Sequence, residues 1–247
     1  EKTKEIPHIK PIFSGSIGVL GLVMLIIMIL APQVGAFETD LTVNGLKQAQ
    51  SSLVRTKTMA DKEEASRYNI AEGVSIIGDS VTLRATPGLQ EVLPDAQTDA
   101  QVSRNTKQAS AIMLYNSQNK ALPKVVVVAT GVNNPEDYKA DLDFLISNLP
   151  KGHQLVLVTP YEGDTSQATQ PYVEKYASYA REVAQQYPYV EIADWNQVSK
   201  DNPDIWKGTD QVHFGKDNTK LEEGAKLYAE TIASAIKALE DKPVKSK

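Results

Sequence analysis

The chain has 247 residues and no cysteine, with a formal net charge of −5 and a pI near 5.3. The lack of cysteine excludes disulfide bonds and a thiolate metal site. The net negative charge gives no sign of a nucleic-acid-binding surface. Hydrophobic residues make up 41% of the chain and charged residues 23%, which is ordinary for a globular protein of one or two domains. Because the first residue is Glu rather than Met, we expect a piece of a longer protein.

An uncharged apolar run covers residues 12–31. Its 20 residues are enough to cross a hydrocarbon core of about 30 Å as a helix, so we predict a transmembrane helix. Lysines precede the run and acidic residues follow it, so the positive-inside rule predicts that residues 1–11 are cytoplasmic. A signal peptide is the alternative, because the Val-Gly-Ala triplet ending at Ala36 resembles a cleavage site. Both interpretations export the rest of the chain.

A polar segment, residues 32–72, follows the run and is rich in Ala, Lys and Glu from Lys47 onward. This composition predicts a partly helical extracytoplasmic linker. The folded domain is predicted at residues 73–241, and residues 242–247 form a tail.

Short apolar runs alternate with helical stretches throughout the predicted domain. Strands are predicted at Val74–Ile77, Thr98–Val102, Lys124–Thr130, Gln154–Thr159 and Tyr189–Ala193, and helices at residues 104–118, 135–148, 169–187 and 217–239. Continuous apolar runs such as VVVVA fit strands that are covered on both faces, as in parallel sheets. The alternation therefore predicts a three-layer α/β/α, flavodoxin-like domain with a five-stranded parallel sheet.

Ser80 follows the first strand directly, in the stretch Gly78-Asp79-Ser80. Open parallel sheets bind ligands beyond the carboxyl ends of their strands, and Ser80 lies there. Its backbone N–H is at a helix-start position, which favours an anion. A nucleophilic serine also needs a base within hydrogen-bond reach. The alternative is that Ser80 is only an N-cap or turn residue.

Elimination among three histidines identifies a candidate base. His8 precedes the apolar run, and His153 precedes its strand, which places it at the opposite end of the sheet from Ser80. His213 lies between the fifth strand and the last helix, at the correct edge. Asp210, three residues earlier, can accept the imidazole Nδ1–H and leave Nε2 free for the serine proton. A metal-ligand or capping pair is equally typical of Asp-x-x-His, but no other His or Cys lies at that edge, so we expect no metal and no cofactor.

Asn133 follows the predicted central strand, in the stretch Gly131-Val132-Asn133. An amide at this position can donate to a developing oxyanion. The alternative is a helix N-cap before Pro135, a role for which Asn134 is better placed.

The stretches GDSV, GVNN and DQVH resemble the sequence blocks of the SGNH hydrolase family, the GDSL-like esterases, over residues 73–240. The resemblance implies a catalytic triad of Ser80, His213 and Asp210. It also implies an oxyanion hole that includes the Ser80 N–H and the Asn133 amide.

One family feature is missing. The chain has no Gly between Gly88 and Gly131, where the family has its second-block Gly. Ser103, in the stretch AQVSRN, is the expected substitute in the oxyanion hole. Any residue except Pro supplies an N–H, but the freedom of Gly at positive φ is lost.

The order of membrane helix, linker and SGNH domain resembles the C-terminal part of type A peptidoglycan O-acetyltransferases of Gram-positive bacteria. This resemblance implies that a membrane acyltransferase-3 domain supplies acetyl groups. The SGNH domain then passes them, through an acetyl-serine, to the C6 hydroxyl of N-acetylmuramic acid in peptidoglycan. It further implies a membrane-anchored protein with an extracellular catalytic domain and a role in lysozyme resistance. The alternatives are an SGNH carbohydrate acetylesterase and a non-catalytic cell-wall-binding module.

Overall fold

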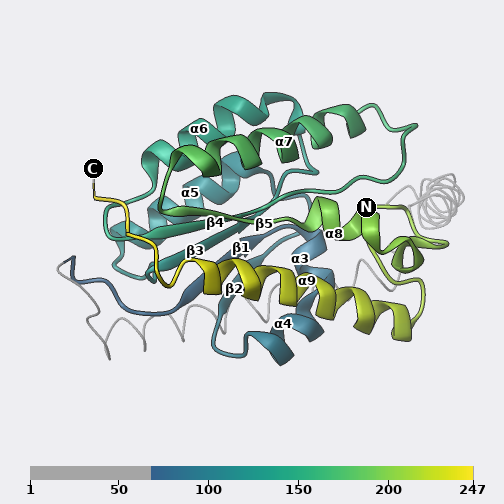
Figure 1. Cartoon of the computed structure of the whole chain (residues 1–247), viewed down its shortest axis with the longest axis horizontal. Helices are drawn as coiled ribbons and strands as arrows, with labels where there is room; N and C mark the ends of the chain where they lie inside the picture. Colours follow the sequence, from purple (N-terminus) through teal and green to yellow (C-terminus); the bar gives the residue numbers. More distant parts are fainter. Residues whose placement is uncertain (1–67, 247) are drawn as a thin grey trace, which may run out of the picture. The chain divides into compact units, whose positions relative to one another are not determined.

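A computed structural model describes residues 68–246, which form a five-stranded parallel sheet with helices on both faces (Figure 1). The strands are β1 (Val74–Gly78), β2 (Gln97–Ala100), β3 (Val125–Ala129), β4 (Gln154–Val158) and β5 (Val190–Ala193). Their order is β2-β1-β3-β4-β5, with every neighbouring pair parallel. This flavodoxin-like order confirms the predicted fold class, and its switch point lies between β1 and β3.

The predicted membrane helix, most of the linker and His8 lie outside the described residues. Within residues 68–246, no helix combines the length and the apolar character needed to cross a bilayer.

The register aligns the carboxyl ends of the three strands nearest the switch point. Gly78, the last residue of β1, pairs with Ala100 of β2 and with Ala129 of β3. The segments that follow these strands therefore begin side by side at one edge of the sheet.

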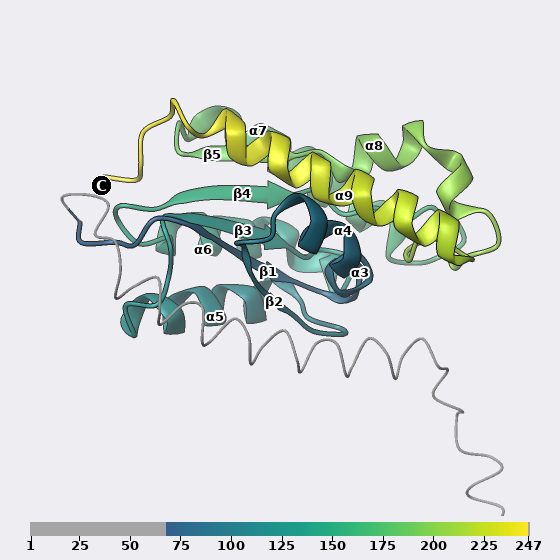
Figure 2. The ribbon, with the colours of Figure 1, turned by 90° about the horizontal axis from the view of Figure 1, so that it is seen from below.

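Helices cover both faces of the sheet. Figure 1 shows α5 (Thr106–Gln118), α6 (Tyr138–Asn148) and α7 (Gln170–Gln186) above the sheet, and α4 (Thr86–Val92) and α9 (Asn218–Ala238) below it. Figure 2, seen from below, shows α9 crossing in front of the strands with α3 (Ser80–Arg84) and α4 beside it.

Alternate strand residues supply two separate cores, as the period of two in a strand requires. Ile76 and Val127 pack in the core that includes α4 and α9, whereas Ile77 and Val128 pack in the core that includes α5, α6 and α7. The continuous apolar runs of the sequence are explained by this two-sided burial.

Several short elements were not predicted from the sequence. They are α3, α4, α8 (Trp195–Asp201) and the 3₁₀ segments η1 (Pro135–Asp137) and η2 (Pro203–Trp206). Each is too short to show a helical period. The first residues predicted for the helix at 135–148 form η1, and α6 begins at Tyr138.

The predicted strand Thr98–Val102 is shifted, because β2 spans Gln97–Ala100. The chain leaves the sheet in a turn that the Arg104 N–H closes by donating to the Gln101 carbonyl at 3.3 Å.

Candidate active site

The sharp turn between β1 and α3 presents Ser80 at the carboxyl edge of the sheet. Asp79 caps α3, because its carboxylate accepts the Val81 N–H at 2.9 Å. Ser80 is therefore the first residue of α3 rather than its N-cap, which corrects the capping alternative. Gly78 is required by close approach, since a Cβ there would lie 2.1 Å from the Thr82 Oγ1.

Ser80, His213 and Asp210 form a continuous chain of hydrogen bonds. The Ser80 Oγ lies 2.8 Å from the His213 Nε2, and the His213 Nδ1 lies 2.7 Å from the Asp210 Oδ2. A carboxylate only accepts hydrogen bonds, so the Nδ1 carries the proton and the Nε2 accepts from the serine hydroxyl. The structure thus brings the three predicted triad residues together, in the geometry that general-base activation of a serine requires.

Arg84 ties the helix that carries Ser80 to the loop that carries His213. Its Nε donates to the Phe214 carbonyl at 3.0 Å, and its terminal NH2 group donates to the Gly215 carbonyl. Arg84 is the last residue of α3, so the nucleophile and the candidate base are held by one short helix.

The loop before α9 turns at Asp210, whose side chain is 57% exposed. The Asp210 Oδ1 accepts the N–H groups of Val212 at 3.0 Å and of His213 at 2.7 Å. Burial opposes ionisation, but hydrogen bonds from the His213 ring and these backbone groups lower the pKa of Asp210 to about 2. Asp210 is therefore an anion at neutral pH and can stabilise an imidazolium on His213.

Asn133 faces the same edge from the segment after β3. Its side-chain Nδ2 donates to the Arg104 carbonyl at 3.2 Å. Asn134, not Asn133, occupies the N-cap position of η1, so the capping alternative for Asn133 is wrong. An amide nitrogen has two N–H donors, so a second is available to an oxyanion.

Ser103 keeps the backbone conformation for which a glycine is usually needed. Its φ is 60°, in the left-handed region, although it carries a side chain. Ser103 therefore adopts the left-handed conformation that was expected to be lost with the missing Gly. Its sequence neighbours gave no signal of this.

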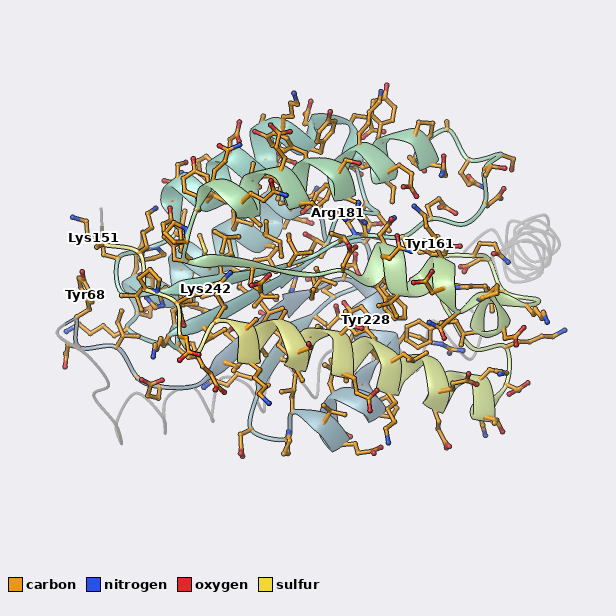
Figure 3. All side chains as sticks on the ribbon, viewed as in Figure 1. Tyr68, Lys151, Tyr161, Arg181, Tyr228 and Lys242 are labelled. Carbon is orange, nitrogen blue, oxygen red and sulfur yellow. The ribbon has the colours of Figure 1, made fainter. Side chains whose placement is uncertain are left out.

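A small hollow is lined by Asp79 and Val81, the two sequence neighbours of Ser80. Its volume is about 20 Å³, enough for one water-sized group, and its lining also includes Val132, Pro160, Tyr161 and Trp195. Figure 3 shows Tyr161 beyond the carboxyl end of β4 and Tyr228 on α9 below the sheet, with Lys151 at the opposite end of the molecule. The lining is mainly apolar.

The remaining described histidine lies far from this edge, as predicted. His153 directly precedes β4, is buried, and its Nδ1 lies 2.8 Å from the Pro123 carbonyl oxygen. In residues 68–246, no cluster of three or more His, Cys, Asp or Glu side chains could hold a metal ion.

Asp79 is a titratable member of the site that sequence reasoning missed. Its side chain is 3% exposed, and burial raises its pKa to about 6. Hydrogen bonds from Val81 and Thr82, and the nearby charge of Arg104, oppose the rise. An acidic residue at the end of a buried strand was the available signal.

We expect an Asp79→Asn variant to be more stable than the parent protein at pH 7, by about 2 to 3 kcal/mol. The unfolded carboxyl ionises near its ordinary value of 3.8 and the folded one near about 6. The parent therefore loses stability as pH rises through this interval, and the full deficit is present above it. An Asn side chain keeps an oxygen for the Val81 N–H, so the cap of α3 survives.

Denaturant unfolding at pH 4 and pH 7.5 measures this difference. The matched control is Asp217→Asn, which changes the exposed N-cap of α9 and should show no such gain. An Asp79→Asn gain of equal size at both pH values would contradict the burial argument.

No protein-family model and no curated protein sequence matches the chain. Among solved structures, the C-terminal catalytic domain of peptidoglycan O-acetyltransferase A from Streptococcus pneumoniae, solved with a methylsulfonyl adduct, is 62% identical with a TM-score of 0.71. The match covers 72% of this chain and 99% of that domain.

Two distant structures share the fold. A putative acylhydrolase from Bacteroides fragilis is 15% identical with a TM-score of 0.54, covering 75% of this chain and 95% of its own. A member of the lipolytic G-D-S-L family from Veillonella parvula is 13% identical with a TM-score of 0.52, covering 68% and 99%. The predicted resemblance is confirmed: the chain has the SGNH hydrolase fold and belongs to the family of peptidoglycan O-acetyltransferase A catalytic domains.

Proposed function

We propose that this chain transfers acetyl groups to peptidoglycan through an acetyl-serine intermediate on Ser80. The observation that carries the proposal is the chain of contacts from Asp210 through His213 to the Ser80 hydroxyl. It occurs in a domain that is 62% identical to a peptidoglycan O-acetyltransferase A.

In the first half-reaction, the Ser80 Oγ attacks the carbonyl carbon of the acetyl donor while its proton passes to the His213 Nε2. The resulting oxyanion is held by the N–H groups of Ser80 and Ser103 and by the Asn133 amide. When the tetrahedral intermediate collapses, the donor's leaving oxygen takes the proton from His213. Ser80 then carries the acetyl group.

In the second half-reaction, the C6 hydroxyl of N-acetylmuramic acid gives its proton to the His213 Nε2 and attacks the acetyl carbonyl carbon. The bond to the Ser80 Oγ breaks, and His213 returns the proton to the serine. The hollow lined by Asp79 and Val81 would take the acetyl methyl group.

The placement of the protein forms part of this proposal. Residues 12–31 would anchor it in the cell membrane, residues 32–72 would link the anchor to the catalytic domain at residues 73–241, and that domain would face the cell wall. An acyltransferase-3 domain in the membrane would deliver the acetyl groups. The length and lack of charge of the apolar run support the anchor.

An acetyl-transfer assay tests the function. The 247-residue chain in mild detergent is incubated with 4-nitrophenyl acetate and a glycan oligomer that contains N-acetylmuramic acid. We expect an acetyl group on Ser80 in mass spectra of the quenched enzyme, and acetylated glycan with the new ester at C6 of muramic acid. Release of acetate alone, at a rate that the glycan does not change, would instead identify an acetylesterase. No acetyl-enzyme and no turnover would identify a binding module.

A further inference from the structure

Arg104 is a buried charged residue that the triad does not use. Its side chain is 5% exposed, and its NH1 group donates to the Gly78 carbonyl at 3.1 Å and also to the Asp99 carbonyl. Its NH2 group donates to the Asp99 carboxylate at 2.7 Å. The guanidinium therefore joins the carboxyl end of β1, where the Ser80 turn begins, to the end of β2.

The backbone of Arg104 contacts the other two donor segments. Its carbonyl accepts the Asn133 amide at 3.2 Å, and its N–H closes the turn that holds Ser103 in the left-handed conformation. One residue thus bonds to, or directly adjoins, each of the three segments that supply the proposed oxyanion donors.

We propose that Arg104 is the positioning residue of the oxyanion hole, which it assembles by fixing the Ser80 turn, the Ser103 turn and the Asn133 amide relative to one another. This inference rests on the proposed function. Oxyanion donors stabilise a transition state only when they are fixed in place before the reaction. A left-handed residue with a side chain also costs free energy and persists only where its surroundings hold it. Anchoring by Arg104 would supply that support where the family has a glycine.

The geometry needs an arginine rather than any cation. A guanidinium is a planar fork with five N–H donors, so it can reach two carbonyls and a carboxylate together. A lysine has three donors on one atom and cannot span the same acceptors. Arg104→Lys should therefore retain only part of the kcat that Arg104→Met loses.

Steady-state kinetics of the 247-residue chain with 4-nitrophenyl acetate and the glycan oligomer test the proposal. We expect Arg104→Met to lower kcat by about 10²-fold, close to the loss of one oxyanion donor, with less than about a threefold change in the KM of the ester. Arg104→Lys should lower kcat by about tenfold. A Lys variant with the parent kcat would overturn the proposal, and it serves as the test even if the Met variant does not fold.

A double-mutant cycle separates positioning from a general loss of stability. Asn133→Ala alone should cost about 10²- to 10³-fold in kcat. If Arg104 acts through the oxyanion hole, the combined variant should lose much less than the product of the two losses. Losses that multiply would overturn the inference.

The matched control is Lys245→Met. Lys245 is another buried cation, 7% exposed, whose Nζ donates to the carbonyls of Ile146 and Ser147. Its N–H donates to the His153 carbonyl, at the start of β4 and thus at the opposite end of the sheet from Ser80. This variant should lose stability and keep its kcat.

The Ser80→Ala variant distinguishes a failure of the inference about Arg104 from a failure of the proposed function. If Ser80→Ala abolishes turnover while Arg104→Met keeps the parent kcat, the inference about Arg104 fails and the proposed function stands. If Ser80→Ala keeps its turnover, the proposed function itself fails.

Discussion

A Ser80→Ala variant is expected to lose about 10⁶-fold in kcat for acetyl transfer and to form no acetyl-enzyme. The hydroxyl that it removes is the group 2.8 Å from the His213 Nε2, and alanine offers no atom on which an acetyl group could reside. The Ser80 side chain is buried and small, so the loss of one oxygen should change the melting temperature little. Stopped assays with the activated ester, read by mass spectrometry and by glycan acetylation, measure both effects.

His213→Ala should be nearly as inactive, and the double variant should be no worse than either single one, because members of a triad act as a unit. The control is Ser110→Ala. Ser110 is also a buried serine, on α5, and its hydroxyl donates to the Thr106 carbonyl in the helical layer on the other face of the sheet. Its kcat should equal that of the parent. If Ser80→Ala still accumulates acetyl-enzyme, the nucleophile is another residue of the chain.

The location of the site was predictable because parallel strands share one constraint. All their carboxyl ends meet at the same edge, so the position of a residue before or after a strand decides where it lies. That argument was enough to separate His213, which follows β5, from His153, which precedes β4. Both placements are confirmed.

The supports of the site were not predictable, because they are contacts between distant parts of the chain. Arg84 and Phe214 are 130 positions apart in the sequence, and Arg104 and Gly78 are 26 positions apart. No local pattern marks either arginine, since guanidinium groups occur mainly on surfaces. The left-handed φ of Ser103 escaped prediction for a related reason. The turn contains no glycine to signal it, and the Arg104 N–H closes it.

The short helices escaped prediction for lack of length. α3 has five residues, so it contains barely more than one helical turn, and the Ser80 turn was recognised without it. Sequence reasoning consequently left open whether Ser80 is only an N-cap or turn residue. The Asp79 carboxylate decides this, because it caps α3 by accepting the Val81 N–H. Its burial also raises its pKa.

An Asp210→Asn variant is expected to lose about 10³- to 10⁴-fold in kcat without losing its fold, because it imposes the wrong tautomer on His213. The Asp210 Oδ1 accepts two backbone N–H groups, so the oxygen of an asparagine must take that position. Its NH₂ group then faces the His213 Nδ1, which can only accept. The ring proton is driven to the Nε2, which loses its capacity to take the proton of Ser80.

The control for this variant is Asp204→Asn, an exposed carboxylate on η2 that pairs with Lys207 at 2.6 Å and makes no contact with the triad. Its kcat should match the parent, since exposed ion pairs contribute little. Nitrogen NMR of the imidazole ring reports the tautomer directly, so the cause can be checked apart from the rate. If Asp210→Asn is slow while His213 still carries its proton on Nδ1, the carboxylate acts through its charge on the imidazolium rather than through the tautomer. If the variant is as fast as the parent, Asp210 is not the orienting residue, and the contact at 2.7 Å is incidental to catalysis.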